Sequence, residues 1–420
     1  MSSSAPGPDD ALPTGIALTA HDDRFREQPQ PVYDALRARA PFHHDAAYGR
    51  TLLTRQDDVR AALRHKHFSV DARNSLADSY MRRVAATGVA ESVGATAYEP
   101  PLVLLDDPDH RRIRLLMSKA FTPPAVEAMR GRVEQITDDL LDAIGSREHI
   151  DLIEDFAGPL PTQAILDMMG MTCASRSDFK RWSEDILMGY DPERDAGTQR
   201  RLREAYLAMS SQFRQVVEAR RLVPQDDLIS AMVKAQEEAD TLSDLEIISL
   251  CTQLMVAGNV TTTDLIGNGL HALLTHPTQL ALLRARPVLI GNAIEEMLRF
   301  DCPITETARF PLQDDTLNGC PVHRGQTLTA SLAAANHDPA AFSAPHTFDI
   351  TRAENPHLAF GSGVHVCLGA PLARLEGQIA IPALLARFPS IELDPQKPHA
   401  RRHLPFFRGF STLPLRVGTA

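Results

Sequence analysis

The sequence predicts a mainly α-helical protein with a smaller β portion, which is an α+β fold. Three observations favour this class. Apolar residues recur at helical spacing from Pro31 to about Pro303. Between Ile304 and Leu332, Thr, Val, Leu and Phe alternate with turn residues, as in short strands and hairpins. Of the 420 residues, 43% are hydrophobic and 23% charged, the balance of a globular protein that can bury a large core.

The chain begins with residues 1–20, which are rich in Ser, Pro, Gly and Asp and predict a flexible arm. No repeat or linker divides residues 21–420, so we expect one domain there. The start lacks the basic and apolar regions of a signal peptide, and no stretch of about 18 apolar residues suits a transmembrane helix. These features predict a cytoplasmic protein, and the net charge of −11 disfavours general nucleic-acid binding.

Helical patterns follow one another along most of the chain. A capping box at Ser243 and Glu246 predicts the start of the longest helix, which should continue to Thr275, just before Pro277. With roughly 32 residues at 1.5 Å per residue, this helix would span about 48 Å and cross the domain. The other predicted helices cover residues 111–121, 124–144, 158–169, 199–222 and about 368–388, and a last β-like stretch contains residues 413–415.

The middle of the longest predicted helix contains poor helix formers. Gly258 and Asn259 are followed by four β-branched residues, from Val260 to Thr263. Two interpretations stay open. The segment is either a weak point that tertiary packing tolerates, or a local opening where a ligand approaches the backbone.

The segment from Phe360 to Gly369 carries the strongest chemical signal. Its three glycines allow tight turns and the close approach of a flat ligand. Cys367 comes just before a predicted helix with Pro371 in its first turn. Unpaired N–H groups and the positive end of the helix dipole would therefore face the sulfur. Such surroundings lower a thiol pKa and favour the thiolate, which is the form that binds metals.

The other four cysteines are interpreted as small buried hydrophobic residues. They are Cys173, Cys251, Cys302 and Cys320. Their spacing contains no C-x-x-C, which argues against a structural zinc site, a redox dithiol and a covalently attached haem. A sparse, odd set of cysteines also fits a reducing compartment better than a disulfide framework.

The cysteine segment resembles the haem-binding signature of the cytochrome P-450 family, F-G-x-G-x-H-x-C-x-G. All six fixed positions match, at Phe360, Gly361, Gly363, His365, Cys367 and Gly369. The resemblance extends over nearly the whole chain and implies a triangular helical body. It also implies haem b, iron protoporphyrin IX, between the long central helix and the cysteine loop, with Cys367 as the iron ligand. A thiolate ligand pushes electron density onto iron and favours O–O cleavage.

The same resemblance implies where the haem is held. Four side chains are expected to donate to its propionates, and five further residues to lie against it: His110, Arg114, Arg309 and His365 in the first group, and Ala257, Gly258, Phe360, Gly361 and Gly369 in the second. His110 and Arg114 are four residues apart on a predicted helix, so they share one face. The donors are needed because a buried unpaired charge is costly.

Glu296 and Arg299 look like the family's E-x-x-R on the helix before the first strands of the β portion. The same spacing occurs elsewhere in the chain, and only the position upstream of the cysteine loop selects this pair. The implied role is structural, a buried ion pair beneath the haem. The alternative is an exposed helix pair, worth roughly a few tenths of a kcal/mol.

The oxygen side departs from the family pattern. The central helix resembles A-G-x-[DE]-T-T, so Thr261 takes the place of the oxygen-binding threonine, and Thr262 and Asn259 complete the expected catalytic set. Val260 replaces the usual acidic residue, although O–O cleavage needs two protons. Asp264 lies one helical turn away and is a poor substitute. Either Asn259 and water relay the protons, or the substrate carries the donor, or the enzyme bypasses oxygen reduction.

The favoured function is a monooxygenase that inserts one oxygen atom of O2 into a small or medium apolar organic substrate. The alternatives are a peroxide-using peroxygenase or isomerase and a non-catalytic haem sensor or electron carrier. No dinucleotide fingerprint follows a strand. Electrons should therefore come from a ferredoxin or flavodoxin with an NAD(P)H-dependent reductase. A basic docking patch is predicted at Arg111, Arg112, Lys119 and Arg374, although a merely solvated face is the alternative.

The substrate pocket is expected at positions given by the family pattern. Its walls would come from the region of about 72–105 and from Gln253, Val256, Val260, Ile304, Thr305, Phe406 and Phe407, with helices around 170–222 as a mobile lid. Gln253 and Thr305 are possible polar anchors. Two phenylalanines suggest a compact or flat substrate, such as a terpenoid or an aromatic compound, but simple core packing would also explain them.

Overall fold

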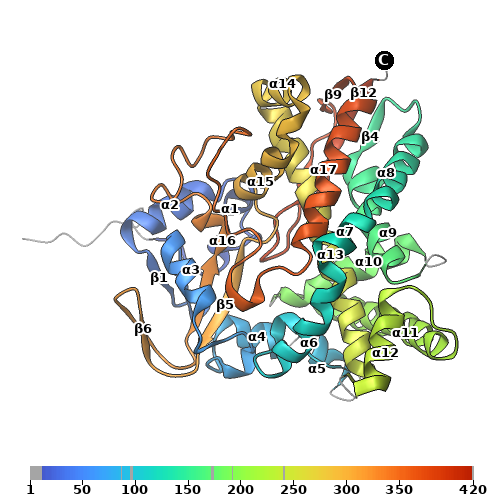
Figure 1. Ribbon diagram of the computed structural model, residues 1–420. Coiled ribbons are helices and arrows are strands. Elements are labelled where there is room, and N and C mark those ends of the chain that lie inside the picture. The colour runs from blue at the N-terminus through green and yellow to red at the C-terminus, as the bar shows by residue number, and fades with distance from the viewer. Residues whose placement is uncertain are drawn as a thin grey trace, which may run out of the picture.

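The computed structural model describes residues 12–86, 88–94, 98–171, 175–191, 193–239 and 242–418. Four predictions therefore lie partly or wholly outside the described residues: the first half of the arm, Cys173, and parts of the variable region and of the lid. Helices gather around one long central helix, and the largest sheet lies to one side with the N-terminal helices (Figure 1). This is the predicted mainly α fold with a smaller β portion.

The helices of the described chain are α1 (Asp23–Glu27), α2 (Gln30–Arg39), α3 (Gln56–Arg64), α4 (Tyr80–Ala86), α5 (Val89–Val93), α6 (Asp109–Met117), α7 (Pro123–Ala128), α8 (Arg130–Ile144), α9 (Pro159–Met168), α10 (Arg176–Leu187), α11 (Ala196–Leu222), α12 (Leu228–Ala239), α13 (Asp244–Thr275), α14 (Pro277–Ala285), α15 (Ile290–Phe300), α16 (Leu332–Ala335) and α17 (Ala370–Arg387). The predicted helix over residues 124–144 is divided into α7 and α8. Among the described helices, none combines the length and apolar character needed to cross a bilayer.

The strands are β1 (Phe42–Asp45), β2 (Arg50–Leu53), β3 (Phe68–Ser69), β4 (His149–Asp151), β5 (Glu306–Pro311), β6 (Asp315–Leu317), β7 (Cys320–Val322), β8 (Thr327–Ser331), β9 (Ser390–Leu393), β10 (Ala400–Arg401), β11 (Phe410–Thr412) and β12 (Pro414–Gly418). The main sheet has the order β1-β2-β8-β5-β3, in which only β2 and β8 are parallel. The predicted β segment after Ile304 is thus confirmed, including the β6–β7 hairpin.

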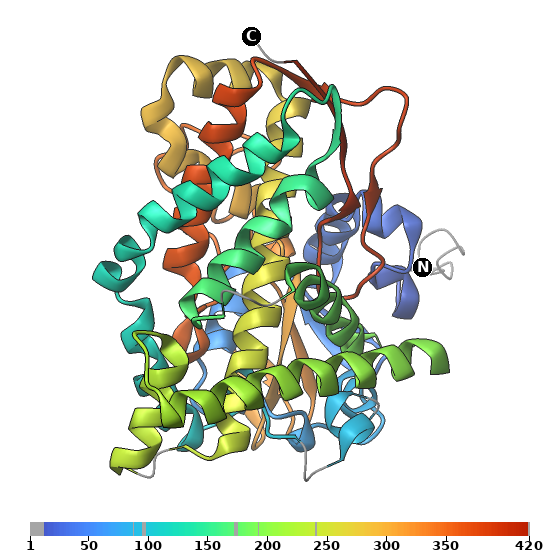
Figure 2. The same ribbon diagram turned by 90° about the vertical axis from the view of Figure 1, so that its right-hand side faces the viewer.

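Helix α13 has the predicted start and end. The Ser243 hydroxyl accepts a hydrogen bond from the Glu246 N–H, and the Glu246 carboxylate accepts one from the Ser243 N–H. The helix is unbroken through Gly258 and Asn259, so it has no local opening. Packing tolerates the weak helix formers because most of this helix is buried, with α9, α10 and α11 against it (Figure 2).

Part of the predicted flexible arm is packed onto the body. Gly15–Leu18 form a short 3-10 helix. Leu18 is buried and clusters with Leu36 of α2 and Leu52 of β2. Residues 12–20 therefore contribute to the core beside the main sheet.

Glu296 and Arg299 lie at the centre of a buried network on α15. The guanidinium group of Arg299 donates two hydrogen bonds of 2.8 Å to the Glu296 carboxylate. It also donates to the carbonyl groups of Asn336, Pro345 and Thr347. Both side chains are fully buried, so the pair is not the exposed helix pair of the alternative interpretation. The network fixes the long loop before the cysteine segment onto α15.

Candidate functional site

A cavity of about 340 Å³ lies between α13 and the cysteine segment. Its lining is mostly apolar and also receives residues from α6, β5, α17 and the chain before β11. Most of the predicted site residues meet here: His110, Arg114, Gln253, Ala257, Gly258, Thr261, Thr262, Ile304, Arg309, Phe360, Gly361, His365, Cys367, Gly369, Phe406 and Phe407. Segments far apart in the sequence thus form one site.

Helix α13 turns only one face to this cavity. The lining residues are spaced by three or four: Leu250, Gln253, Leu254, Ala257, Gly258, Thr261, Thr262 and Leu265. Asn259, Val260 and Val256 lie on other faces and are buried away from the cavity. The placement of Asn259 in the catalytic set and of both valines in the pocket wall is therefore corrected. The Asn259 carbonyl groups accept from the Thr263 hydroxyl instead.

Thr305 also lies outside the cavity. Its N–H donates to the Phe406 carbonyl at 2.8 Å, and its side chain lines a separate small cavity behind Phe406 and Phe407. The neighbouring Ile304 pairs with Phe407 through an isolated β-bridge and does reach the main cavity. The prediction of Thr305 as a wall residue is therefore corrected, whereas that of Ile304 fits the cavity.

The cysteine segment turns tightly around Cys367. Gly361 and Gly363 have φ of 72° and 78°, values that favour glycine. A Cβ on Gly363 would lie 2.7 Å from the Leu63 carbonyl oxygen of α3. The Cys367 N–H donates to the Phe360 carbonyl at 2.9 Å. The side chain of Cys367 is thereby held just before α17 and is exposed to the cavity.

The surroundings of the Cys367 sulfur differ from the prediction in one respect. Burial deep in the protein raises the thiol pKa above its usual value. The N–H groups of Gly369 and Ala370 and the charge of Arg114 oppose this effect, as expected at a helix start. The net shift of the thiol pKa is upward because burial is the larger effect. The sequence indicated the opposing groups but not the depth of the site.

Four basic side chains gather at one edge of the cavity. The rings of His110 and His365 are 4.1 Å apart, and Arg114 donates to the Val366 carbonyl at 2.7 Å. Burial lowers the pKa of Arg309 to about 10, and burial with neighbouring positive charge lowers that of His365 to about 3. No carboxylate of the described residues forms an ion pair with either arginine, and His110 Nε2 has no partner there. This edge therefore suits an anionic group.

A buried carboxylate on α17 was missed in the sequence. Glu376 lines the cavity with 1% of its surface exposed, and its Oε1 has no hydrogen-bond partner among the described residues. Burial raises its pKa to about 8, although the Thr262 hydroxyl offsets part of this effect. The sequence does contain a sign that Glu376 is buried, because its helical spacing places it on the same face as the apolar residues Leu372 and Ala373.

Asp264 is ruled out as a group that serves the cavity. It is fully buried, and Arg402 donates to its Oδ1 at 3.0 Å. A Cβ on Gly409 would lie 1.9 Å from the same oxygen, so the chain before β11 covers this carboxylate closely. Asp264 does not line the cavity, and its ion pair joins α13 to the chain before β11.

The far wall of the cavity is aromatic. Tyr190, which follows α10, contacts the rings of Phe406 and Phe407 at 5.7 and 5.8 Å. Tyr190 belongs to the predicted lid, and Met81 and Leu102 belong to the predicted variable region; all three line the cavity. Phe406 has a φ of 69°, a conformation that non-glycine residues seldom adopt. The loop that presents it is thus held firmly by its neighbours.

Comparisons with known proteins agree with this geometry. The profile of the family described as Cytochrome P450 matches residues 52–286 and 283–417. The chain is 38% identical over 400 residues to 6-deoxyerythronolide B hydroxylase of Saccharopolyspora erythraea, covering 94% of this chain and 97% of that protein. It is 37% identical over 417 residues to cytochrome P450 monooxygenase PikC of Streptomyces venezuelae, covering 97% and 95%. The solved structure of the Bacillus subtilis polyketide synthase cytochrome P450 PksS gives a TM-score of 0.83 at 35% identity, covering 95% of this chain and 99% of that one.

Proposed function

The chain belongs to the cytochrome P450 family and is a P450 monooxygenase with a haem-thiolate cofactor, and on this premise we propose that it inserts one oxygen atom of O2 into a small or medium apolar organic substrate. The observation that carries the proposal is the arrangement of the cavity. A cysteine sulfur, two arginines with two histidines, and a mostly apolar wall face the same space.

The residues present fit haem b, with Cys367 as the iron ligand. The apolar flanks suit a flat ring. The unpartnered Nε2 of His110 and the guanidinium group of Arg309, which has no carboxylate partner among the described residues, suit its two carboxylates. Arg114 and His365 complete this set of donors. Five further lining residues would contact the ring: Ala257, Gly258, Gly361 and Gly369, which are small and would leave room for it, and Phe360, which would offer it apolar surface. When bound, haem supplies the oxygen chemistry that the side chains lack.

Glu376 is our candidate for the proton source that Val260 does not provide. A carboxyl group with a pKa of about 8 is largely protonated at neutral pH. Glu376 reaches from α17 to the Thr262 side chain. Thr262 and its neighbour Thr261 lie on the face of α13 that lines the cavity. The Thr261 hydroxyl donates to the Ala257 carbonyl at 2.6 Å and keeps its oxygen free to accept a further hydrogen bond. A relay through Asn259 is disfavoured because that side chain faces Thr263.

The substrate is proposed to be mainly apolar with one hydrogen-bond donor. Leu102, Leu250, Ile304 and Phe407 supply apolar surface. Gln253 Oε1 is buried and has no partner among the described residues, so it would anchor the donor. The name of the solved PksS structure refers to a polyketide synthase, and another relative is named as a hydroxylase of 6-deoxyerythronolide B. We therefore extend the predicted class from compact terpenoid or aromatic compounds to polyketide-like molecules.

A ferredoxin or flavodoxin is the proposed electron donor, docking on the cysteine side. The predicted basic patch needs revision. Arg112 pairs with Asp109 and Glu246, and Arg374 pairs with Glu295. The exposed members are Arg111 and Lys119. Leu115 of α6 and Val364 of the cysteine segment add exposed apolar side chains. We propose this smaller mixed surface as the docking site.

Turnover assays would test the proposed function. The protein should first be screened for compounds that shift the haem spin state. Product should then form with ferredoxin, its reductase and NADPH under O2. Labelled O2 should place one labelled atom in the product. Product formation only with added peroxide would instead support the peroxygenase alternative, which the valine at position 260 motivates.

A further inference from the structure

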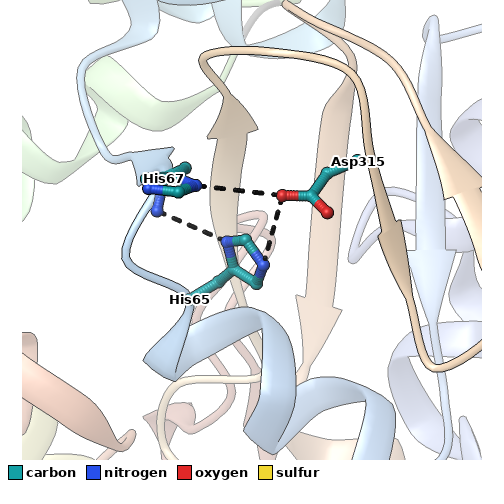
Figure 3. Close-up of side chains that lie close together, drawn as sticks. All are labelled: His65, His67 and Asp315. Carbon is teal, nitrogen blue, oxygen red and sulfur yellow. Dashed lines mark hydrogen bonds and ion pairs between the residues drawn. The ribbon is translucent and has the colours of Figure 1, made fainter.

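Two histidines and an aspartate meet on the surface, away from the cavity. His65 and His67 lie between α3 and β3, and Asp315 begins β6 of the hairpin that faces them (Figure 3). The three side chains come from two segments some 250 positions apart in the sequence. Nothing in the proposed reaction uses them.

The potential ligand atoms converge. His65 Nε2 lies 3.6 Å from Asp315 Oδ2, and His67 Nδ1 lies 3.9 Å from the same oxygen. All three ligand atoms are within 4.8 Å of one another. In a tetrahedral zinc site with bonds of about 2.0–2.1 Å, neighbouring ligand atoms are roughly 3.3 Å apart. The three groups therefore need to move by less than about 1 Å to share one ion.

The composition of the cluster selects the class of ion. Imidazole nitrogens suit zinc and related divalent transition metals, whereas calcium and magnesium prefer oxygen ligands. One carboxylate provides partial charge compensation. His67 is 58% exposed at its side chain, which leaves the remaining coordination positions to water. His65 is better fixed, because its ring stacks on Phe68 at a centroid distance of 3.9 Å.

Two existing contacts must change when a metal binds. The side-chain amide nitrogen of Gln313 lies 3.3 Å from His67 Nδ1, and the metal would replace this exposed contact. The His67 N–H donates to His65 Nδ1 at 3.4 Å, which is a long hydrogen bond. If His65 Nε2 binds a metal, the imidazole proton moves to Nδ1 and this contact is lost. The loss is small because the nearby solvent can accept from Nδ1–H and supply the N–H of His67. The long contact therefore does not prevent coordination.

We propose that His65, His67 and Asp315 form a surface site for a divalent transition metal of the zinc class. The bound ion would join the loop after α3 to the β6–β7 hairpin. Leu63 of α3 lines the main cavity, and the same end of α3 packs against Gly363 of the cysteine segment. The site therefore lies on the element that supports the cysteine loop, but its occupancy does not depend on the reaction at the cavity.

Equilibrium dialysis of the tag-free holoenzyme against zinc chloride at pH 8 tests this proposal. We expect one tightly bound zinc per haem after chelator treatment and dialysis. His67→Ala and Asp315→Asn should each weaken binding by more than the about 10–100-fold typical of losing an outer-shell partner. Zinc should also raise the Tm of the wild-type protein and not that of the His65→Ala/His67→Ala variant.

His323→Ala is the matched control. His323 lies on the same hairpin segment and faces Asp314 at 3.7 Å, but it does not belong to the cluster. This variant should bind zinc as the wild type does. The proposal is overturned if the wild type binds no zinc at one equivalent, or if His323→Ala weakens binding as much as His67→Ala does. Weak, independent binding at several histidines would also contradict it.

Discussion

Two buried carboxylates show how differently two regions of this protein use polar groups. Glu296 on α15 accepts five hydrogen bonds, from Arg299, Arg352, Asn355 and the Asp349 N–H. Glu376 on α17 is just as deeply buried, yet one of its oxygens has no partner among the described residues. A satisfied buried group fixes the fold, whereas an unsatisfied one is available to a ligand or a proton.

The same contrast separates the regions around these carboxylates. Beneath the cysteine segment, the donors of Arg299 and the oxygens of Glu296 are all matched, and the atoms of this network without a partner among the described residues are on neutral amides, Asn336 Nδ2 and Asn355 Oδ1. Around the cavity, His110, Gln253 and Glu376 each keep a buried atom without a partner in the described chain. The first region therefore holds the structure together, and the second is arranged for molecules that bind there.

Breaking the satisfied network should have the largest effect. In Arg299→Ala, the Glu296 carboxylate loses its main partner inside the core. Removing one partner of a buried ion pair costs about 3–5 kcal/mol. Chemical denaturation should show this loss, and haem should be retained poorly. An unfolding free energy within about 0.5 kcal/mol of the wild type, the range of ordinary surface changes, would contradict the assignment of this region.

Changing the unsatisfied carboxylate should affect turnover and leave folding intact. Glu376→Gln keeps the shape of the side chain but removes its proton. Loss of a general acid typically lowers rates by about 100-fold or more, so product formed per NADPH should fall sharply. Glu376→Asp is the control and should recover part of the activity. Equal coupling in the wild type and Glu376→Gln would remove Glu376 from the proton path.

The pH dependence sharpens this prediction. The pKa of Glu376 is raised in the folded protein from its usual value of 4.5 to about 8, chiefly by burial. The folded state thus binds the Glu376 proton more tightly than the unfolded state does. The contribution of this proton to the free energy of unfolding is therefore lost as the pH rises from about 4.5 through 8. Turnover should also fall above about pH 8 as the acid ionises. Glu376→Gln should lack both effects, as measured by denaturation and by rate profiles.

Gln253 offers a smaller test on the other side of the cavity. Gln253→Leu removes the unpaired buried carbonyl and a proposed anchor for the substrate. A hydrogen bond of this kind contributes about 1 kcal/mol, so the dissociation constant from the spin-state titration should rise by roughly fivefold. Gln253→Glu, which keeps an acceptor, is the comparison. No change for any ligand with a donor group would exclude the anchor.

The smallest effect on coupling is expected at Val260. This residue is buried on a face of α13 that does not line the cavity. An aspartate there would face the core, so Val260→Asp should lower stability without improving product formed per NADPH. Val260→Asn provides a control of similar shape. A clear gain in coupling would mean that position 260 does reach the reacting atoms.

Local sequence signals predicted much of this structure. The capping residues of α13 and the glycines of the cysteine segment act within a few residues, so their effects could be read directly. Glu376 could not be recognised, because its burial depends on how α17 packs on α13. Asn259 and Val260 were misplaced because a linear pattern gives order along a helix, while the helical turn decides which face each residue occupies.

We propose that the Cys367 thiolate holds haem in the cavity. The absorption spectrum of the reduced, carbon-monoxide-bound protein tests it most directly. The wild-type protein should show the red-shifted Soret band of thiolate ligation, and Cys367→His should show the band of histidine ligation while still binding haem. A wild-type spectrum typical of histidine ligation, or a Cys367→His spectrum identical to that of the wild type, would contradict the account.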